Sequence, residues 1–307
     1  MSDISILFQK QFHDWEMLNR NYAALKSIKA KEFKIDSARF KVQFNPARII
    51  SSSAKVDEKS IKERRCFLCS ENRPEEQAGL DWNNDYTILI NPYPIFPRHL
   101  TIPSKQHEPQ RISGRIAHMM NLAAYLDDFT IFYNGPRCGA SAPDHAHFQA
   151  GNKGFLPFEK DYAKGKMTEI KRIPGAAMFI LSDIARIAFM IQTDNIEAGE
   201  ELFNILYQAL PMEDIDVEPM LNILCWNEKG KWIIAVFPRI KHRPTCYFAD
   251  GNNNLLITPA SVDMGGVFIT PLEKDFNKVT AYDIKNILDE VCISQETACH
   301  IIERIRN

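Results

Sequence analysis

Two histidines and a glutamine stand at alternate positions in the stretch PDHAHFQAG, as His145, His147 and Gln149. In a β-strand, side chains two residues apart lie on the same face, so these three groups are predicted to line one face of a strand. A neutral imidazole is an effective nucleophile near neutral pH, and a fixed amide donor can stabilise charge that develops on a phosphoryl group. The alternative is an edge strand that exposes polar groups without a function.

The segment before this predicted strand is rich in small residues. It reads NGPRCGASAPD, at residues 134–144. Glycine allows the main chain to approach a phosphate closely, and successive main-chain N–H groups can form an anion-binding concavity. The segment and the strand together indicate a phosphate site.

A C-x-x-C pair, Cys66 and Cys69, stands upstream in the stretch CFLC. This spacing suits zinc or a redox pair. A redox pair normally begins a helix in a thioredoxin-like unit, a context that this polar, turn-rich loop lacks. A closed zinc site needs two more ligands. His107 follows a predicted strand and is the natural third, and one histidine of the H-x-H pair could be the fourth, so spacing alone leaves zinc and a metal-free loop both open.

Composition sets the protein class. The 307 residues are 45% hydrophobic and 25% charged, which is enough for one large domain or two smaller ones. A net charge of -2 gives no reason to expect binding to nucleic acid or to a membrane. No apolar run approaches the ~20 residues of a membrane span, and charges interrupt the N-terminal stretch where a signal sequence would be apolar. Seven mostly scattered cysteines fit a reducing compartment, so we expect a cytoplasmic protein.

The elements that must position these residues follow from hydrophobic periodicity. Helical spacing predicts helices from the N-terminus to about residue 28, at 111–128, at 198–210, and at 281–292 and 294–306 near the C-terminus. Alternation and β-branched runs predict strands at 87–90, 99–102 and 129–135, a strand, turn and strand at 40–54, the H-x-H strand itself, a hairpin at 221–239 and a strand at 262–271. Hairpins mixed with helices predict an α+β fold with mainly antiparallel sheets and a soft boundary near residues 155–170.

The stretch YNGPRCGASAPDHAHFQAG resembles the active-site segment of the galactose-1-phosphate uridylyltransferase branch of the histidine-triad superfamily. That branch includes diadenosine tetraphosphate phosphorylases and GDP-hexose phosphorylases, and its signature is H-x-H-x-Q; the HFQA wording is nearest the GDP-hexose phosphorylases. The stretches RCFLC, QFNPARI and NPYPIFPRHLTIPSKQH are similar to further segments of the family, as are ILCWNEKGKWIIAVFPR and SVDMGGVFITP. The resemblance implies a histidine-triad-like α+β fold of two pseudo-repeated halves, each with an antiparallel sheet flanked by helices. Residues 1–160 would be the catalytic half and 161–307 a catalytically silent half.

The resemblance also implies site residues, position by position. His147, the second motif histidine, matches the nucleophile, and Gln149 matches the residue that hydrogen-bonds the phosphoryl oxygens. The zinc ligands of the zinc-containing members correspond to Cys66, Cys69, His107 and His145. The residues that contact substrate correspond to Arg48, Asn91, Asn134 and Ser141. Because four ligands leave no open position, such a zinc would be structural.

The implied reaction is nucleotidyl transfer through a nucleotidyl-histidine intermediate, on a nucleoside-diphosphate sugar or a dinucleoside polyphosphate, with phosphate or a sugar phosphate as acceptor. Gln149 favours this over hydrolysis, because an amide cannot exchange a proton at neutral pH and water needs a general base, whereas phosphate arrives ionised. A non-catalytic nucleotide-binding protein and a nucleotide hydrolase are the alternatives. We expect a monomer or homodimer, with no nucleic-acid or membrane partner.

Two features of the second half have open interpretations. The basic stretch FPRIKHRP, with Arg239, Lys241, His242 and Arg243, is either a solvated loop or a set of cations that reaches the substrate phosphates. The stretch VDMGG, from Val262 to Gly266, is either a plain turn or a tight loop beside the substrate pocket.

Overall fold

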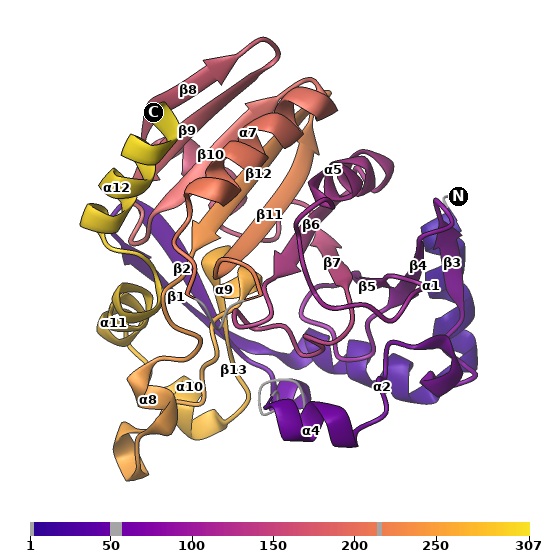
Figure 1. Cartoon of the computed structure of the whole chain (residues 1–307). Coiled ribbons are helices and arrows are strands. Elements are labelled where there is room, and N and C mark those ends of the chain that lie inside the picture. Colours follow the sequence, from indigo (N-terminus) through magenta and orange to yellow (C-terminus); the bar gives the residue numbers. More distant parts are fainter. Residues whose placement is uncertain (1–2, 50–56, 214–216) are drawn as a thin grey trace.

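The computed structural model describes residues 3–49, 57–213 and 217–307, and within them a ten-stranded antiparallel sheet spans the molecule (Figure 1). In spatial order its strands are β3 (Gly79–Trp82), β4 (Tyr86–Ile90), β5 (His99–Pro103), β7 (His147–Asn152), β6 (Phe129–Asn134), β11 (Leu221–Glu228), β12 (Lys231–Pro238), β10 (Ala188–Thr193), β9 (Ala176–Ser182) and β8 (Lys166–Ile173). A smaller sheet has the order β1 (Lys29–Ile35), β2 (Ala38–Phe44) and β13 (Val267–Thr270), with β13 parallel to β2. The predicted α+β fold with mainly antiparallel sheets is confirmed.

The large sheet consists of two five-stranded units with the same strand order. Each unit begins at an outer edge of the sheet with its first, second and third strands in chain order, and its fifth and then its fourth strand follow toward the centre. In both units a helix precedes the fourth strand: α5 (Ile116–Tyr125) comes before β6, and α7 (Ile196–Ala209) comes before β11. We expected a separate sheet in each half, but β6 pairs with β11 and joins the two units into one sheet. The division into functional halves at 160/161 stays a prediction.

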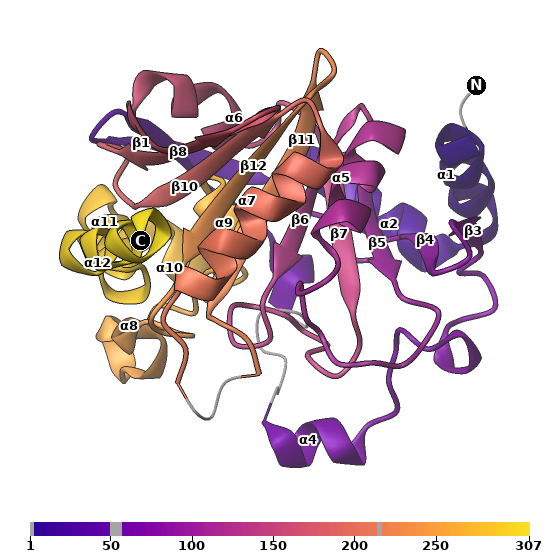
Figure 2. The ribbon, with the colours of Figure 1, turned by 45° about the horizontal axis from the view of Figure 1, so that its top comes forward.

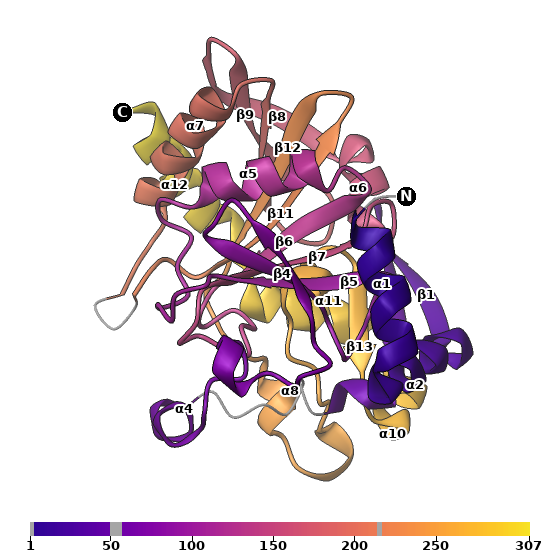
Figure 3. The same ribbon diagram turned by 90° about the vertical axis from the view of Figure 1, so that its right-hand side faces the viewer.

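The two faces of the large sheet are covered differently (Figures 2 and 3). One hydrophobic core holds the helices α1 (Asp3–Asp14), α2 (Glu16–Ala24), α5, α7 and α12 (Gln295–Arg306). The opposite core packs the small sheet and the helices α9 (Ser261–Met264), α10 (Glu273–Lys278) and α11 (Ala281–Val291) mainly against the second five-stranded unit. The same face of β4 to β7 instead carries Thr101, Asn134, His147 and Gln149 beside the apolar Leu89 and Phe132, and this is where a site can form.

Shorter elements connect these layers. They are the helices α4 (Glu58–Glu63), α6 (Phe158–Asp161) and α8 (Thr245–Phe248), and the 3-10 turns η1 (Leu25–Ser27), η2 (Pro46–Arg48), η3 (Ser70–Asn72), η4 (Tyr162–Lys164) and η5 (Gly251–Asn253). Across the described residues, we find no helix with the length and apolarity that a membrane crossing requires.

The observed elements differ from the predicted ones at three informative places. The N-terminal helix is two helices, because the chain breaks at Trp15. The strand and turn predicted at the start of 40–54 are β2 followed by η2, and most of the second predicted strand falls on residues 50–54, outside the described part of the chain. The H-x-H strand begins only at His147, so His145 lies in the turn before it and does not share the strand face of His147 and Gln149.

Candidate active site

A cavity of about 450 Å³ lies against the polar face of β4 to β7. The residues predicted to act on substrate all line it: Arg48, Asn91, Asn134, Ser141, His147 and Gln149. The second half closes the cavity with Thr258, Ala260, Val262, Asp263 and Ile269. The stretch VDMGG therefore lies beside the pocket, as one of its two interpretations predicted, but Val262–Met264 belong to the helix α9, and the strand predicted over 262–271 is limited to β13.

His147 is held as a neutral imidazole with one nitrogen available. Its Nδ1 lies 2.8 Å from the main-chain oxygen of His145. Because a carbonyl can only accept, Nδ1 carries the proton and Nε2 keeps its lone pair. Burial lowers the pKa of His147 to about 4, although the hydrogen bond to the main chain of His145 opposes this shift, so the ring is neutral at neutral pH. This is the form that a nucleophile requires.

Gln149 receives its orientation from His99 on the neighbouring strand β5. The main-chain N–H of Ile95 donates to Nδ1 of His99 at 3.2 Å, so the ring proton resides on Nε2, which donates to Oε1 of Gln149 at 3.0 Å. His99 is fully buried, and burial lowers its pKa to about 3. The amide oxygen of Gln149 is thereby engaged, and its NH2 group is the part that remains for a ligand.

The two asparagines are oriented by similar means. Oδ1 of Asn134 accepts from Nδ2 of Asn222 at 3.0 Å and from the N–H of Ser261 at 2.8 Å, so Nδ2 of Asn134 is left as a donor. Oδ1 of Asn91 accepts from the N–H of Tyr93 at 2.9 Å. The second half thus fixes Asn134, although that residue belongs to the first.

Arg48 supplies a cation at the cavity wall. Its Nη1 donates to the main-chain oxygen of Tyr93 at 2.8 Å. Its Nε and the hydroxyl of Thr258 are buried and have no hydrogen-bond partner within the described part of the chain. Burial lowers the pKa of Arg48 to about 10, with Asp263 opposing, so the guanidinium stays charged at neutral pH. Such donors are what an anionic ligand would satisfy.

The small-residue loop also has a packing role. Gly139 has a φ of +94°, and a Cβ there would lie 2.6 Å from the Cβ of Ala260. Glycine is required at this position because the loop meets the C-terminal segment so closely. The small residues therefore join the two halves over the cavity, a role that the sequence did not reveal.

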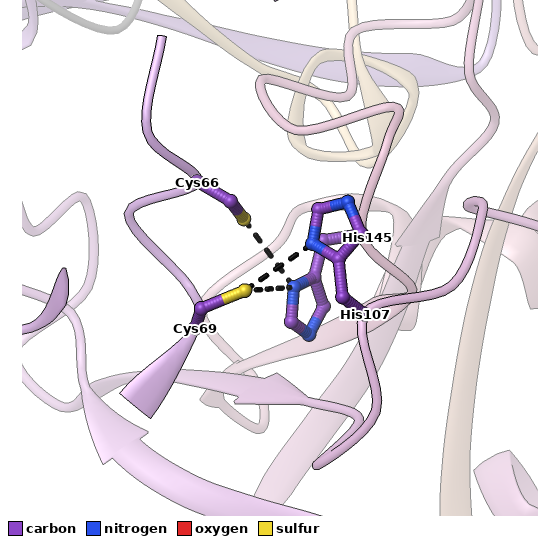
Figure 4. A group of neighbouring side chains, drawn as sticks. All are labelled: Cys66, Cys69, His107 and His145. Carbon is purple, nitrogen blue, oxygen red and sulfur yellow. Dashed lines mark hydrogen bonds between the residues drawn. The ribbon is translucent and has the colours of Figure 1, made fainter. Parts of the chain in front are cut away.

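The Cys and His residues predicted to bind metal converge on one point (Figure 4). Donor atoms of Cys66, Cys69, His107 and His145 all lie within 4.8 Å of one another. Nδ1 of His145 is 3.3 Å from Sγ of Cys66 and 3.6 Å from Sγ of Cys69, and Nδ1 of His107 is 3.2 Å from Sγ of Cys69. A tetrahedral zinc with its usual bond lengths separates sulfur and nitrogen ligands by about 3.5 Å. The cluster thus has the donor types and spacing that fit zinc.

Outer contacts support this arrangement. Nε2 of His145 lies 2.8 Å from the main-chain oxygen of Ser104, which assigns the ring proton to Nε2 and leaves Nδ1 toward the sulfurs. Nε2 of His107 lies 3.9 Å from a carboxylate oxygen of Asp144, which in turn pairs with Arg64 at 2.6 Å. The turn before β7 therefore directs His145 to the cysteines, while His147, the first residue of β7, lines the cavity.

The basic stretch of the second half does not reach the cavity. Arg239 is buried, and its five N–H groups donate to Asn222 and to the main-chain oxygens of Val291, Pro259, Lys241 and His242. Lys241 pairs with Glu290. Arg239 acts indirectly, since the Asn222 that it binds also holds Asn134.

Several residues of the site were not found from the sequence. Trp15 and Met17 line the cavity from the junction of α1 and α2, and Thr258 lines it from the far end of the chain. Helical periodicity assigned Trp15 to a core stripe, and it is indeed buried. Only contacts between distant parts of the chain reveal these roles.

The comparisons with known proteins concern the sequence of the chain and its fold. Residues 7–152 match a family described as "Domain of unknown function (DUF4922)". The chain is 25% identical over 176 residues to a galactose-1-phosphate uridylyltransferase of Halalkalibacterium halodurans, covering 50% of this chain and 34% of that protein. It is 24% identical over 177 residues to diadenosine tetraphosphate phosphorylase 2 of Saccharomyces cerevisiae, covering 52% of this chain and 54% of that protein. The matches thus span between a third and about half the length of these curated relatives.

Solved structures extend the likeness to the whole fold. The crystal structure of a yeast Ap4A phosphorylase aligns with a TM-score of 0.58 at 18% identity, over 93% of this chain and 97% of the other. The same enzyme in complex with Ap4A aligns with a TM-score of 0.54 at 17% identity, over 91% and 96% of the two chains. The structural matches show a shared fold, and the sequence matches support the resemblance to the branch that contains galactose-1-phosphate uridylyltransferase and the Ap4A phosphorylases.

Proposed function

We propose that the protein is a nucleotidyltransferase that works through a nucleotidyl-histidine on His147. The observation that carries the proposal is the state of this imidazole: buried, neutral, with Nδ1 bound to a carbonyl and Nε2 free to attack in a cavity that also holds Gln149 and Arg48. The sequence relatives are named for nucleotidyl transfer and phosphorolysis, which agrees with this chemistry.

The first half-reaction forms one bond and breaks one. Nε2 of His147 attacks the α-phosphorus of the donor, the bond from that phosphorus to the bridging oxygen breaks, and the remainder leaves as a phosphorylated product. The proton on Nδ1 stays in its hydrogen bond to the His145 carbonyl, which stabilises the positive charge on the ring. Donors from Gln149, Asn134 and Arg48 offset the negative charge that grows on the phosphoryl oxygens.

The second half-reaction favours an ionised acceptor. An oxygen of phosphate or of a sugar phosphate attacks the phosphorus, the nitrogen–phosphorus bond breaks, and His147 returns to its neutral form. Gln149 cannot take a proton from water, and His99 behind it is held neutral with its Nε2 proton engaged. Phosphorolysis or transfer is therefore proposed over hydrolysis.

We propose a nucleoside-diphosphate sugar or a dinucleoside polyphosphate as donor. Trp15, Leu68 and Leu89 contribute apolar lining suited to a base, and Thr258 and Asp263 of the second half contribute polar groups. In this proposal residues 1–160 supply the reacting groups, and residues 161–307 complete the pocket without a nucleophile of their own.

Zinc fits the cluster of Cys66, Cys69, His107 and His145 and is proposed as a structural ion there. When bound, it would cross-link the 66–69 loop to the turn before β7, since all four protein ligands leave no position for substrate. His145 is two residues from His147 and donates to Ser104, so a fixed His145 also fixes the carbonyl that accepts from His147.

The decisive experiment measures covalent adducts by intact-protein mass spectrometry. The protein is incubated with UDP-glucose, GDP-mannose or Ap4A, without phosphate, and a mass increase of one nucleotidyl group is expected with at least one donor. His147→Ala should abolish the increase, and His147→Gly with added imidazole should recover part of the turnover.

His13→Ala, which changes an exposed histidine in the last turn of α1, serves as the matched control and should keep the adduct. Nucleotide binding without any adduct in the wild type would favour a non-catalytic binding protein. Steady turnover without phosphate would favour a hydrolase.

A further inference from the structure

The strands β6 and β7 separate just before they reach the reactive histidine. Their pairing runs from Phe129 opposite Asn152 to Phe132 opposite Gln149 and goes no further. Beyond that point β6 continues beside β11, with Asn134 opposite Asn222, and β7 continues beside β5, with His147 opposite Pro103. The main chains of Asn134 and His147 therefore lack the partner strand that they would have in a continuous ladder.

The side chain of Gln110 fills this gap. Its Oε1 accepts from the main-chain N–H of His147 at 2.7 Å, and its Nε2 donates to the main-chain oxygens of His147 and Asn134, each at 3.0 Å. Gln110 is fully buried. One amide thus replaces the missing strand, and only this orientation of the amide satisfies all three main-chain groups.

The loop that carries Gln110 is itself well held. The main-chain N–H of Gln110 donates to the oxygen of Pro143 at 3.1 Å, and the N–H of Ile112 donates to Glu218 at 2.9 Å. Gln110 is therefore a fixed point that determines where the main chain of His147 lies, and with it where the imidazole stands relative to Asn134 across the cavity.

We propose that Gln110 is a positioning residue for His147: its amide sets the separation of β6 and β7 that brings Nε2 of His147 to the α-phosphorus. The inference rests on the proposed function and adds a residue that touches neither substrate nor the reacting atoms. A methionine at position 110 would fill the same volume but could not hydrogen-bond the N–H and oxygen of His147 or the oxygen of Asn134. These three buried main-chain groups would be unpaired, so the ends of β6 and β7 would shift.

The test is the single-turnover rate of adduct formation, with the nucleotide donor that labels the wild type. Gln110→Met should lower this rate by about tenfold or more, because a reacting group displaced by about 1 Å can cost a hundredfold. The dissociation constant for the mononucleotide product should change far less. Gln11→Met is the matched control: Gln11 is a buried glutamine of the same half that donates to the oxygen of Ala78, away from His147, and its variant should keep the rate.

Gln110→Glu gives a second readout that a loss of stability alone would not move. An ionised carboxylate can accept from the N–H of His147 but faces two carbonyl oxygens, whereas a protonated carboxyl can donate to one of them. The rate relative to wild type should therefore rise as the pH falls. A wild-type rate in folded Gln110→Met, or a pH-independent ratio in Gln110→Glu, would overturn the inference, while absence of any wild-type adduct would instead overturn the proposed function.

Discussion

Nε2 of His99 donates to Oε1 of Gln149 across two adjacent strands, at 3.0 Å. The two residues are diagonal neighbours, since His99 is opposite Gly151 and Gln149 is opposite Thr101. The N–H of Ile95 fixes the tautomer of His99, and the tautomer fixes which end of the Gln149 amide is free. A main-chain donor four residues from His99 thus decides that Gln149 presents N–H groups, rather than an oxygen, to a phosphate.

Removing the hydrogen bond from His99 to Gln149, which we call the relay, should lower the rate of adduct formation only while Gln149 is present. His99→Phe should slow adduct formation, because the amide can then turn its oxygen toward the phosphate. Gln149→Ala should cost roughly 2–4 kcal/mol of transition-state stabilisation, the range for one preorganised donor. In the double variant, replacing His99 should add little further loss. A double-mutant cycle of single-turnover rates measures this coupling, and strictly additive losses would contradict the relay.

Replacing Gln149 with histidine should change the acceptor. An imidazole at this position can exchange protons, so water should compete better with phosphate for the nucleotidyl-histidine. We expect Gln149→His to raise the ratio of hydrolysis to phosphorolysis, whatever happens to the overall rate. The measurement is product analysis at fixed donor with varied phosphate. Gln149→Asn, which shortens the side chain without adding a proton-exchanging group, is the control and should not raise the ratio.

The sequence predicted the local parts of the site because each rests on short spacing. Within each of the motifs H-x-H-x-Q and C-x-x-C, the residues lie within a few positions of one another. The metal cluster combines the C-x-x-C pair and His145 with His107, and the resemblance to the family supplied this combination. One local inference was wrong in detail. A shared strand face for both histidines assumed a strand from residue 143 onward, whereas the Pro143–Asp144 turn directs His145 to the cysteines and the strand starts at His147.

The rest of the site depends on contacts between distant segments. Gln110 lies in a loop without periodicity, and its role appears only where β6 and β7 separate. Asp263 is 116 positions from His147 along the chain, yet both line one cavity. The continuous sheet was missed for the same reason, since the pairing of β6 with β11 leaves no mark in either strand.

The metal cluster yields a stoichiometric prediction. Purified protein should carry close to one zinc ion per chain, and Cys66→Ser should lose it and lower the thermal midpoint, since the 66–69 loop and the turn before β7 would lose their cross-link. Cys299→Ser is the control, because Cys299 is exposed and lies outside the cluster. Elemental analysis with thermal unfolding measures both effects. Full zinc content in Cys66→Ser would show that this cysteine is not a ligand.

The protonation state of His147 can be measured directly. Burial lowers its pKa to about 4 from 6.5, so ¹⁵N chemical shifts of its ring should report the neutral Nδ1–H tautomer down to about pH 5. Linkage gives a second test. Between the two pKa values the unfolded chain binds the proton more tightly, so the stability advantage of wild type over His147→Gln should shrink as the pH falls from 6.5 toward 4. Titration near 6.5 would contradict the buried, neutral ring.

Asp263 should make nucleotide binding depend on pH near neutrality. It lines the cavity together with Arg48, and burial raises its pKa to about 7, so the carboxyl is largely protonated below that pH and ionised above it. An ionised carboxylate would repel the donor's phosphates. The affinity for UDP-glucose, whose own charge is constant in this range, should therefore fall as the pH rises from about 6 to about 8.

Asp263→Asn should remove this fall, because its amide oxygen can still accept from the N–H of Ala260, which Asp263 binds at 2.8 Å, but carries no charge. Calorimetric titration with UDP-glucose at several pH values measures the effect. Asp275→Asn, at a buried aspartate that does not line the cavity, is the control, and its affinity should depend on pH as that of the wild type does. The free energy of unfolding should change with pH in the same direction. Because the pKa of Asp263 is raised on folding, its contribution to stability is present below about pH 4 and is lost as the pH rises toward 7. An affinity that stays constant from pH 6 to 8 in the wild type would show that Asp263 does not face the phosphates.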